Sequence, residues 1–192
     1  MIKFYYGCMY AGKTTFMISI YNTYERKGLN PILLKPVIDN RESDSEGWNT
    51  TTSRNGMTAK VFCFKNLDID INNRYIFIDE GQFLSDKDID YLIWLEKNLN
   101  KEIFIFGLRT NNSGKLFDGS ARLMAIADEL IEIPTLCQHD ECTNKAVIHN
   151  RYINGKLDLS NKPIMIEKDN VKYEAVCLKH WKVENEKYTT SR

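Results

Sequence analysis

Residues 7–14 read Gly-Cys-Met-Tyr-Ala-Gly-Lys-Thr and match the pattern G-x-x-x-x-G-K-[ST] at every fixed position. The apolar run Ile2–Tyr6 precedes this stretch, and residues with helical spacing follow it. Such a loop surrounds phosphate oxygens with backbone N–H groups, while its lysine reaches the β- and γ-phosphates and its threonine binds magnesium. A chance glycine-rich turn is the alternative, and the strand–loop–helix setting argues against it. The predicted nucleotide and magnesium ligands are Gly7, Gly12, Lys13 and Thr14.

Three further apolar runs resemble the first one. They are Ile32–Leu34, Tyr75–Ile78 and Ile103–Phe106. β-Branched and aromatic residues dominate these runs, and none alternates strictly between apolar and polar residues. This is typical of strands that are covered on both faces in a parallel sheet.

The segments between these runs have helical spacing. We predict helices at 14–27, 86–99 and 120–130. In the first helix Phe16, Ile20 and Tyr24 repeat every four residues on one face, and Gly28 is its expected stop. Ser85 is placed as the N-cap of the second helix. Strands that alternate with helices predict an α/β, doubly wound sheet.

The composition is that of a packed globular protein of 192 residues. Its 26 basic side chains balance 26 acidic ones, so no global positive field would hold the chain on nucleic acid or on an anionic membrane. Five cysteines, an odd number, favour a reducing compartment over a secreted disulfide scaffold. No signal-peptide pattern or membrane-spanning run is present. We expect a cytoplasmic protein that binds neither nucleic acid nor membrane.

Two segments depart from the order of strands and helices. Residues 39–58 are rich in Asn, Ser, Thr and Gly, and we predict a long functional loop there. After Pro134 the composition changes, because all three histidines and three of the five cysteines lie beyond it. We therefore predict a nucleotide-binding core at 1–133 and a smaller domain at 134–192.

An apolar run that ends in two carboxylates, Ile76-Phe77-Ile78-Asp79-Glu80, is the second part of the predicted site. In phosphate-loop proteins a magnesium-organising acid stands at such a position beside the first strand, which makes Asp79 that candidate. Neighbouring strand residues point to opposite sides, so we expect Glu80 to face a different ligand. If that ligand is an alcohol, Glu80 is placed as its general base. A solvated acidic strand end is the alternative.

Two ligand pairs near the carboxyl end predict a metal site. Cys137 and Cys142 form one pair, and Cys177 and His180 form the other. Three thiolates and one imidazole suit a tetrahedral, structural zinc ion. His139 lies inside the first pair and is an alternative ligand. Buried, unlinked cysteines are the other alternative, since the first spacing is at the wide end of the usual range.

In their order and spacing these motifs resemble those of the type II thymidine kinases, and most closely the bacterial and phage branch. The resemblance covers nearly the whole chain. It includes residues 79–83, Asp-Glu-Gly-Gln-Phe, residues 107–110, Gly-Leu-Arg-Thr, and residues 114–117, Gly-Lys-Leu-Phe. It implies an α/β, P-loop fold of RecA-like type with a parallel sheet, followed by a small zinc-binding lasso domain that closes over the nucleoside.

The resemblance also implies roles for individual residues. The phosphate loop and Asp79 would serve ATP and magnesium, and Glu80 would remove the proton from the nucleoside 5′-hydroxyl. Asp39-Asn40-Arg41 matches the family's Asp-x-Arg. This match places Asp39 at the cofactor site and makes Arg41 a candidate for steadying the transferred phosphate, which a planar guanidinium suits.

The implied nucleoside pocket combines residues of both predicted domains. Tyr173 matches the lasso tyrosine that packs on the sugar or base, and Arg151 matches an arginine after the first metal pair. Met9 belongs to the phosphate loop and is expected at both the cofactor and the nucleoside. Without the family, several of these residues would be ordinary core residues. The expected nucleoside-binding residues are Met9, Gln82, Phe83, Leu108, Asn112, Phe117, His149 and Tyr173.

Three departures from the family pattern concern this pocket. Asn112 stands where a Phe usually packs against the base, and His149 stands where a small or apolar residue is common. Residues 166–170, Ile-Glu-Lys-Asp-Asn, replace the usual paired glycines of the lasso. Because one lost stacking contact costs on the order of 1 kcal/mol, the resemblance implies a relaxed or shifted base preference rather than loss of thymidine binding.

The activity expected from the resemblance is transfer of the γ-phosphate of ATP to the 5′-hydroxyl of thymidine or a deoxyuridine-like nucleoside, giving dTMP. The alternative is a nucleotide-binding regulatory homologue with altered or lost nucleoside specificity. A DNA-stimulated ATPase fits poorly with the neutral charge. The expected cofactors are ATP, Mg²⁺ and structural Zn²⁺, and the family implies a homotetramer or homodimer.

Overall fold

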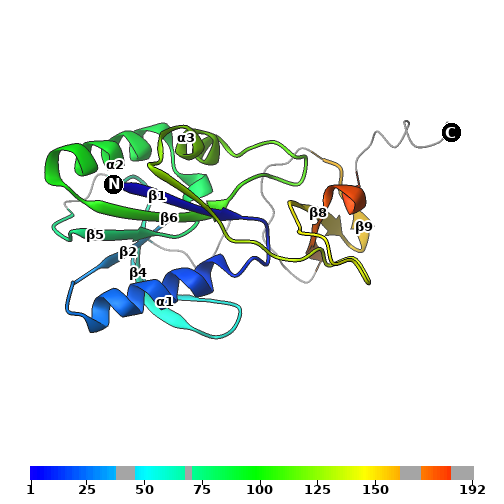
Figure 1. Ribbon diagram of the computed structural model, residues 1–192, viewed down its shortest axis with the longest axis horizontal. Coiled ribbons are helices and arrows are strands. Elements are labelled where there is room, and N and C mark those ends of the chain that lie inside the picture. The colour runs from blue at the N-terminus through cyan, green and yellow to red at the C-terminus, as the bar shows by residue number, and fades with distance from the viewer. Residues whose placement is uncertain (38–45, 68–70, 161–169, 183–192) are drawn as a thin grey trace.

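The computed structural model describes residues 1–37, 46–67, 71–160 and 170–182. At its centre is a seven-stranded sheet with the strand order β3-β4-β2-β5-β6-β1-β7 (Figure 1). All neighbouring strands are parallel except β3 and β4. The prediction of a mostly parallel α/β sheet is therefore confirmed. The strands are β1 (Ile2–Gly7), β2 (Ile32–Pro36), β3 (Gly47–Thr52), β4 (Thr58–Phe64), β5 (Tyr75–Ile78), β6 (Glu102–Leu108) and β7 (Glu129–Glu132).

Helices cover both faces of this sheet (Figure 1). They are α1 (Lys13–Arg26) on one face, and α2 (Asp86–Leu99) and α3 (Asp118–Ile126) on the other. Each face has its own buried cluster, one that includes Met17 of α1 and one that includes Leu92 of α2 and Leu123 of α3. As predicted, Ser85 caps α2, and it forms a reciprocal capping box with Asp88.

The predicted apolar face of α1 is only part of the face that packs on the sheet. The buried residues of the helix are Met17, Ile18 and Tyr21. Ile20 and Tyr24, which were predicted on this face, are partly buried against the same core cluster. Phe16 is 44% exposed and touches the rings of Tyr5 and Phe106. The apolar stripe is therefore wider than a repeat of every four residues indicates.

Two segment boundaries also differ from the predictions. Within the predicted loop at 39–58, residues 47–52 form β3 and Thr58 begins β4. β3 is an edge strand, and its Trp48 is 56% exposed. Backbone pairing with β4 rather than apolar burial therefore holds the strand, and its sequence lacks the hydrophobic pattern that would predict it. The third helix ends at Ile126, because Ala127 is extended and residues 129–132 pair with β1.

A smaller antiparallel sheet lies at one end of the large one (Figure 1). Its order is β10-β8-β9, from β8 (Ile148–Ile153), β9 (Lys156–Leu157) and β10 (Val171–Val176), and the short helix η2 (Leu178–His180) follows. Its small core contains Cys137, Ile148, Val176 and Cys177. None of the helices in the described ranges has the length and apolar character that a membrane span requires.

Candidate active site

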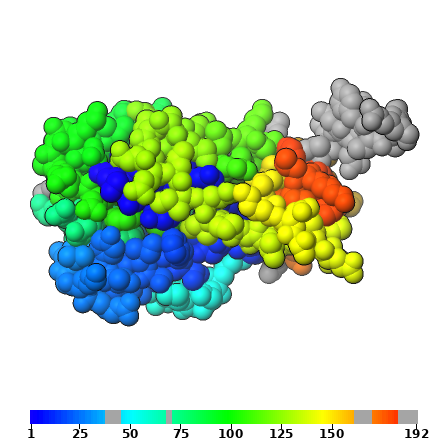
Figure 2. Space-filling view, viewed as in Figure 1, coloured from blue at the N-terminus to red at the C-terminus, as the bar shows by residue number. Residues whose placement is uncertain are grey.

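One cleft of about 880 Å³ is lined by residues of both sheets. Its walls come from the phosphate loop, the end of β5, the turn between β3 and β4, and the strands β8 and β10. Figure 2 shows the smaller sheet packed against the end of the larger body. Predicted site residues that line the cleft are Met9, Gly12, Lys13, Thr14, Asp79, Glu80, Gln82, Phe83, Leu108, Asn112, Phe117, His149 and Tyr173. Predicted Asp39 and Arg41 lie outside the described residues.

The two glycines of the phosphate loop serve different needs. A Cβ at Gly7 would lie 2.7 Å from the carbonyl oxygen of Ile133, so no side chain fits there. Gly12 has φ +75° and caps α1 in the left-handed conformation. Beside it, Lys13 Nζ donates to the carbonyl oxygen of Cys8 at 2.9 Å. Burial lowers the pKa of Lys13, and an anionic ligand would favour its charged form.

Asp79 contacts the phosphate loop directly. Thr14 Oγ1 donates to Asp79 Oδ2 at 3.1 Å, and the backbone N–H of Glu80 donates to Asp79 Oδ1 at 3.0 Å. Burial, together with the neighbouring charge of Glu80, raises the pKa of Asp79 to about 6. One expectation needs correction: β6 lies between β5 and β1, so Asp79 follows a strand that is not beside the first strand. A hydroxyl and a buried carboxylate in contact are a suitable donor set for Mg²⁺.

Glu80 has a backbone conformation that strand alternation does not predict. β5 ends at Ile78, and Glu80 has φ +58°, a left-handed conformation that is costly for a residue other than glycine. Its carboxylate accepts a hydrogen bond at 2.6 Å from Nε2 of Gln82 in the short helix η1 (Gly81–Phe83). Gln82 Oε1 in turn accepts from the backbone N–H of Leu108 at 2.8 Å. Gln82 therefore fixes Glu80 relative to the end of β6.

His149 and Tyr173 form the opposite wall, on the paired strands β8 and β10. Their rings meet edge to face, with centroids 5.3 Å apart. His149 is 3% exposed, and its Nδ1 has no hydrogen-bond partner among the described residues. Burial lowers the pKa of His149 to about 3, and the charges of Lys13 and Arg151 act in the same direction. This wall therefore presents a neutral imidazole.

The remaining pocket residues are tied to the smaller sheet. Asn112 Nδ2 donates to the carbonyl oxygen of Asp158 at 3.2 Å, and Nε1 of Trp181 donates to the carbonyl oxygen of Asn112 at 3.0 Å. Arg151 is 1% exposed and pairs with Asp158 at 2.6 Å (Nε to Oδ2). Arg151 also donates to the carbonyl oxygen of Ser160 at 3.0 Å. These contacts fix the chain just after β9 beside the cleft.

The turn between β3 and β4 also reaches the cleft; it lies inside the predicted functional loop at 39–58, but none of its residues was predicted individually. Arg54 and Asn55 line the cleft next to the phosphate loop. Thr15 Oγ1 donates to Asn55 Oδ1 at 3.0 Å. The dipeptide Asn55-Gly56 between two β-forming runs is a hairpin signal that could have revealed this turn.

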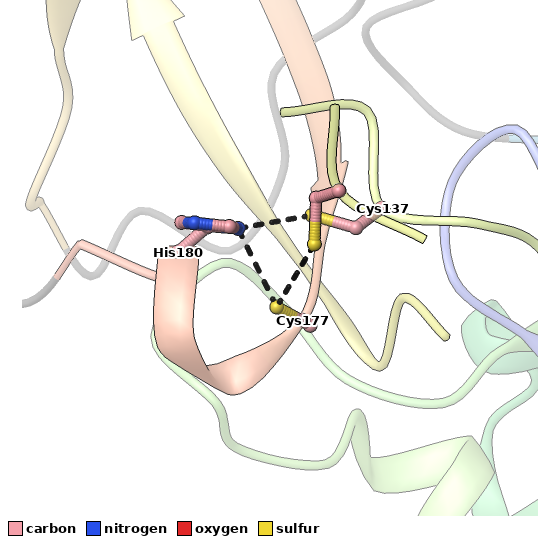
Figure 3. Close-up of side chains that lie close together, drawn as sticks. Cys137, Cys177 and His180 are labelled. Carbon is pink, nitrogen blue, oxygen red and sulfur yellow. Dashed lines mark hydrogen bonds between the residues drawn. The ribbon is translucent and has the colours of Figure 1, made fainter. Parts of the chain in front are cut away.

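Cys137, Cys142, Cys177 and His180 form a cluster whose ligand atoms all lie within 4.8 Å of one another. Nδ1 of His180 lies 3.4 Å from the sulfur of Cys137 and 3.5 Å from that of Cys177, and Figure 3 shows these side chains converging. The sulfurs of Cys142 and Cys177 are 4.0 Å apart. Zinc bonds of about 2.3 Å to sulfur and about 2.0 Å to nitrogen require ligand separations of roughly 3.5 to 3.8 Å in a tetrahedron. The cluster fits a zinc site.

His139, the alternative ligand, lies outside this cluster. Its ring stacks on that of His180, with centroids 3.9 Å apart and an angle of 9° between the planes. Its Nδ1 lies 3.3 Å from the carbonyl oxygen of Asp140. The set of three cysteines and His180 is therefore the one that the geometry favours.

Comparisons with known proteins agree with these motifs. The sequence model of the family described as "Thymidine kinase" matches residues 1–181. The chain is 32% identical to a thymidine kinase of Legionella pneumophila, covering 94% of this chain and 88% of the relative. It is 32% identical to that of Enterobacteria phage T4, covering 93% of each, and 34% identical to that of Streptococcus pyogenes, covering 92% of this chain and 94% of the relative. With a match over nearly its whole length, the chain belongs to the thymidine kinase family.

Proposed function

We propose that this protein is a thymidine kinase that transfers the γ-phosphate of ATP to the 5′-hydroxyl of thymidine or a deoxyuridine-like nucleoside, giving dTMP. One observation carries the proposal. A single cleft contains the phosphate loop, the two carboxylates after β5 and the wall of His149 and Tyr173. A nucleotide and a nucleoside bound in that cleft would therefore meet at the carboxylates.

The phosphate loop binds ATP in this proposal. Backbone N–H groups at the start of α1 and the ammonium of Lys13 contact the phosphates, as in other phosphate loops. Thr14 and Asp79 would hold Mg²⁺, and the bound ion would neutralise charge on the phosphates. Asp39 and Arg41 are proposed at the same end, with Arg41 steadying the transferred phosphoryl group.

Glu80 acts as the general base. As the nucleoside O5′ bonds to the γ-phosphorus, the bond from that phosphorus to the leaving oxygen of ADP breaks, and the hydroxyl proton passes to the carboxylate of Glu80. The hydrogen bond from Gln82 orients this carboxylate. Correct placement of the acceptor and neutralisation of charge supply most of the rate enhancement in such reactions.

The nucleoside binds between the larger body and the smaller sheet. Met9, Leu108, Phe83 and Phe117 supply apolar surface, and Tyr173 packs on the sugar or base. Zinc, held by Cys137, Cys142, Cys177 and His180, stabilises the small sheet that carries Tyr173 and His149. We further propose that residues 134–192 are a zinc-binding lasso domain, that the protein is a homo-oligomer and that it acts in the cytoplasm.

The test is a transfer assay with γ-labelled ATP and a panel of thymidine, deoxyuridine, deoxycytidine and deoxyguanosine. We expect labelled dTMP or dUMP. Glu80→Gln should lower turnover by about 100- to 10,000-fold while the affinities for ATP and nucleoside change little. Glu129→Gln is the matched control, because Glu129 only pairs with Lys3 at the surface. A wild-type protein that binds ATP but labels none of the nucleosides would refute the proposal in favour of a regulatory homologue.

A further inference from the structure

The turn between β3 and β4 contacts residues that precede and follow the Gly12-Lys13-Thr14 segment in the sequence. On one side, the guanidinium carbon of Arg54 lies 4.2 Å from the centroid of the Tyr10 ring. On the other side, the hydroxyl of Thr15 donates to the side chain of Asn55. The turn is therefore positioned by the phosphate loop itself.

Short hydrogen bonds hold this turn in one shape. The backbone N–H of Ser53 donates to the carbonyl oxygen of Met57 at 2.8 Å, and that of Gly56 donates to the carbonyl oxygen of Ser53 at 2.9 Å. The buried hydroxyl of Ser53 bonds Asn55 Oδ1 at 2.6 Å and accepts from the backbone N–H of Met57 at 3.0 Å. Arg54 is thus presented by a turn whose backbone is closed by its own hydrogen bonds.

The phosphate-loop end of the cleft holds two basic side chains beside the two carboxylates. Among the described residues, the basic side chains that line the cleft are Lys13, Arg54 and Arg151. Arg151 is neutralised by Asp158. Burial lowers the pKa of Lys13, the charges of Glu80 and Asp79 raise it, and the charge of Arg54 lowers it, so Arg54 lies close enough to act on Lys13. A polyanion between Lys13 and Arg54 would be attracted by both cations.

We propose that Arg54 binds the triphosphate of ATP, so that the hairpin of β3 and β4 supplies a second cation to the phosphate site. The inference rests on the proposed function in taking ATP as the ligand. Stacking on Tyr10 uses the face of the guanidinium, whereas its N–H donors lie in the guanidinium plane, where they bond two phosphate oxygens at once. Arg54 is then a binding residue of the phosphate site that acts together with Lys13.

The experiment compares the affinities of ATP, ADP and AMP for Arg54→Gln and for the wild-type protein by calorimetry, without nucleoside. We expect ATP to bind about 10- to 100-fold more weakly to the variant, ADP to lose less, and AMP to bind nearly unchanged, since a charged donor to phosphate is lost. Lys60→Gln is the matched control. Lys60 lies on the same hairpin, over the ring of Trp48 at 4.4 Å, and does not line the cleft.

Two results would overturn the inference: equal ATP affinity in Arg54→Gln and wild type, or an equal loss for ATP and AMP. Arg54→Met retains the aliphatic stem and supplies the same comparison if the glutamine variant does not fold. Because nucleoside is absent, these results are separate from those of the transfer assay. Normal ATP binding without phosphorylation of any nucleoside would remove the proposed function and leave the role of Arg54 standing.

Discussion

His149→Gln should make the free energy of unfolding less sensitive to acid. The imidazole is buried against the ring of Tyr173. Burial, with the charges of Lys13 and Arg151, lowers the pKa of His149 to about 3 in the folded protein. The folded protein therefore keeps this side chain neutral, whereas the unfolded chain protonates it near the ordinary pKa of about 6.5.

The size of the effect follows from proton linkage. Above pH 6.5 neither state binds the proton, so the full stability is present. Between about pH 6.5 and 3 only the unfolded state binds it, and the free energy of unfolding falls by about 1.4 kcal/mol for each unit of decreasing pH. From about pH 7.5 to pH 5 the wild-type protein should lose about 2 kcal/mol through His149. Glutamine is similar in size and does not titrate, so the variant should escape this loss.

Urea unfolding, followed by circular dichroism at both pH values with equal zinc, measures the effect. The quantity to compare is the difference in unfolding free energy between variant and wild type. Acid-induced losses that both proteins share, including protonation of the zinc ligands, cancel in that difference. It should shift by about 2 kcal/mol in favour of the variant at the lower pH. A difference that is the same at both pH values would show that His149 is not held neutral by its surroundings.

Three further perturbations probe other parts of the molecule. Asp79→Asn should raise the unfolding free energy of the magnesium-free protein near pH 7.5 by about 1 to 3 kcal/mol. Burial raises the pKa of Asp79 to about 6, so the stability of the wild-type protein falls as the pH rises from about 4 through 6. Urea unfolding tests this, and a less stable variant contradicts it. Its kinase activity should fall at least about 100-fold in a magnesium titration. Gly119→Ala should lower the unfolding free energy by about 1 to 3 kcal/mol in thermal unfolding. The added Cβ would lie 2.8 Å from the carbonyl oxygen of Leu84 and 2.9 Å from that of Gln82. Unchanged stability would mean that the backbone around η1 shifts at little cost. Removal of zinc with a chelator, or the substitution Cys177→Ser, should abolish thymidine binding before ATP binding. Calorimetry with metal analysis measures both affinities. Undiminished thymidine binding by the zinc-free protein would count against a structural role of zinc.

Local chain chemistry made much of the fold and half of the site predictable. The phosphate loop is continuous in sequence, so Gly7, Gly12 and Lys13 were assigned without knowledge of any long-range contact. The cap of Ser85 on α2 follows in the same way from residues three positions apart. The metal ligands are two short pairs, and only their convergence on one point had to be inferred.

What could not be predicted depends on contacts between distant segments. Gln82 orients the carboxylate of Glu80 because it also accepts a hydrogen bond from the backbone of Leu108, which lies 26 residues after Gln82 in the chain. The neutral state of His149 depends on burial by strands that meet only in the fold. Arg54 lies in a polar, half-exposed segment where hydrophobic periodicity gives no signal, although Asn55-Gly56 marks the turn.

The two walls of the cleft are also part of one packed unit, and this bears on how the transfer distance is set. The thiol of Cys8, within the phosphate loop, donates to the carbonyl oxygen of Ala146 at 3.7 Å, and burial raises the pKa of Cys8, which keeps the donor protonated. Arg109 at the end of β6 donates to the carbonyl oxygen of Val147 at 2.8 Å. Because β8 begins directly after Val147, the residues that lead into the strand carrying His149 are joined to the phosphate loop through Cys8 and to the end of the large sheet through Arg109. These contacts therefore fix the spacing between the phosphate loop and the wall of His149 and Tyr173, and in the proposed reaction this spacing sets the distance between the two substrates.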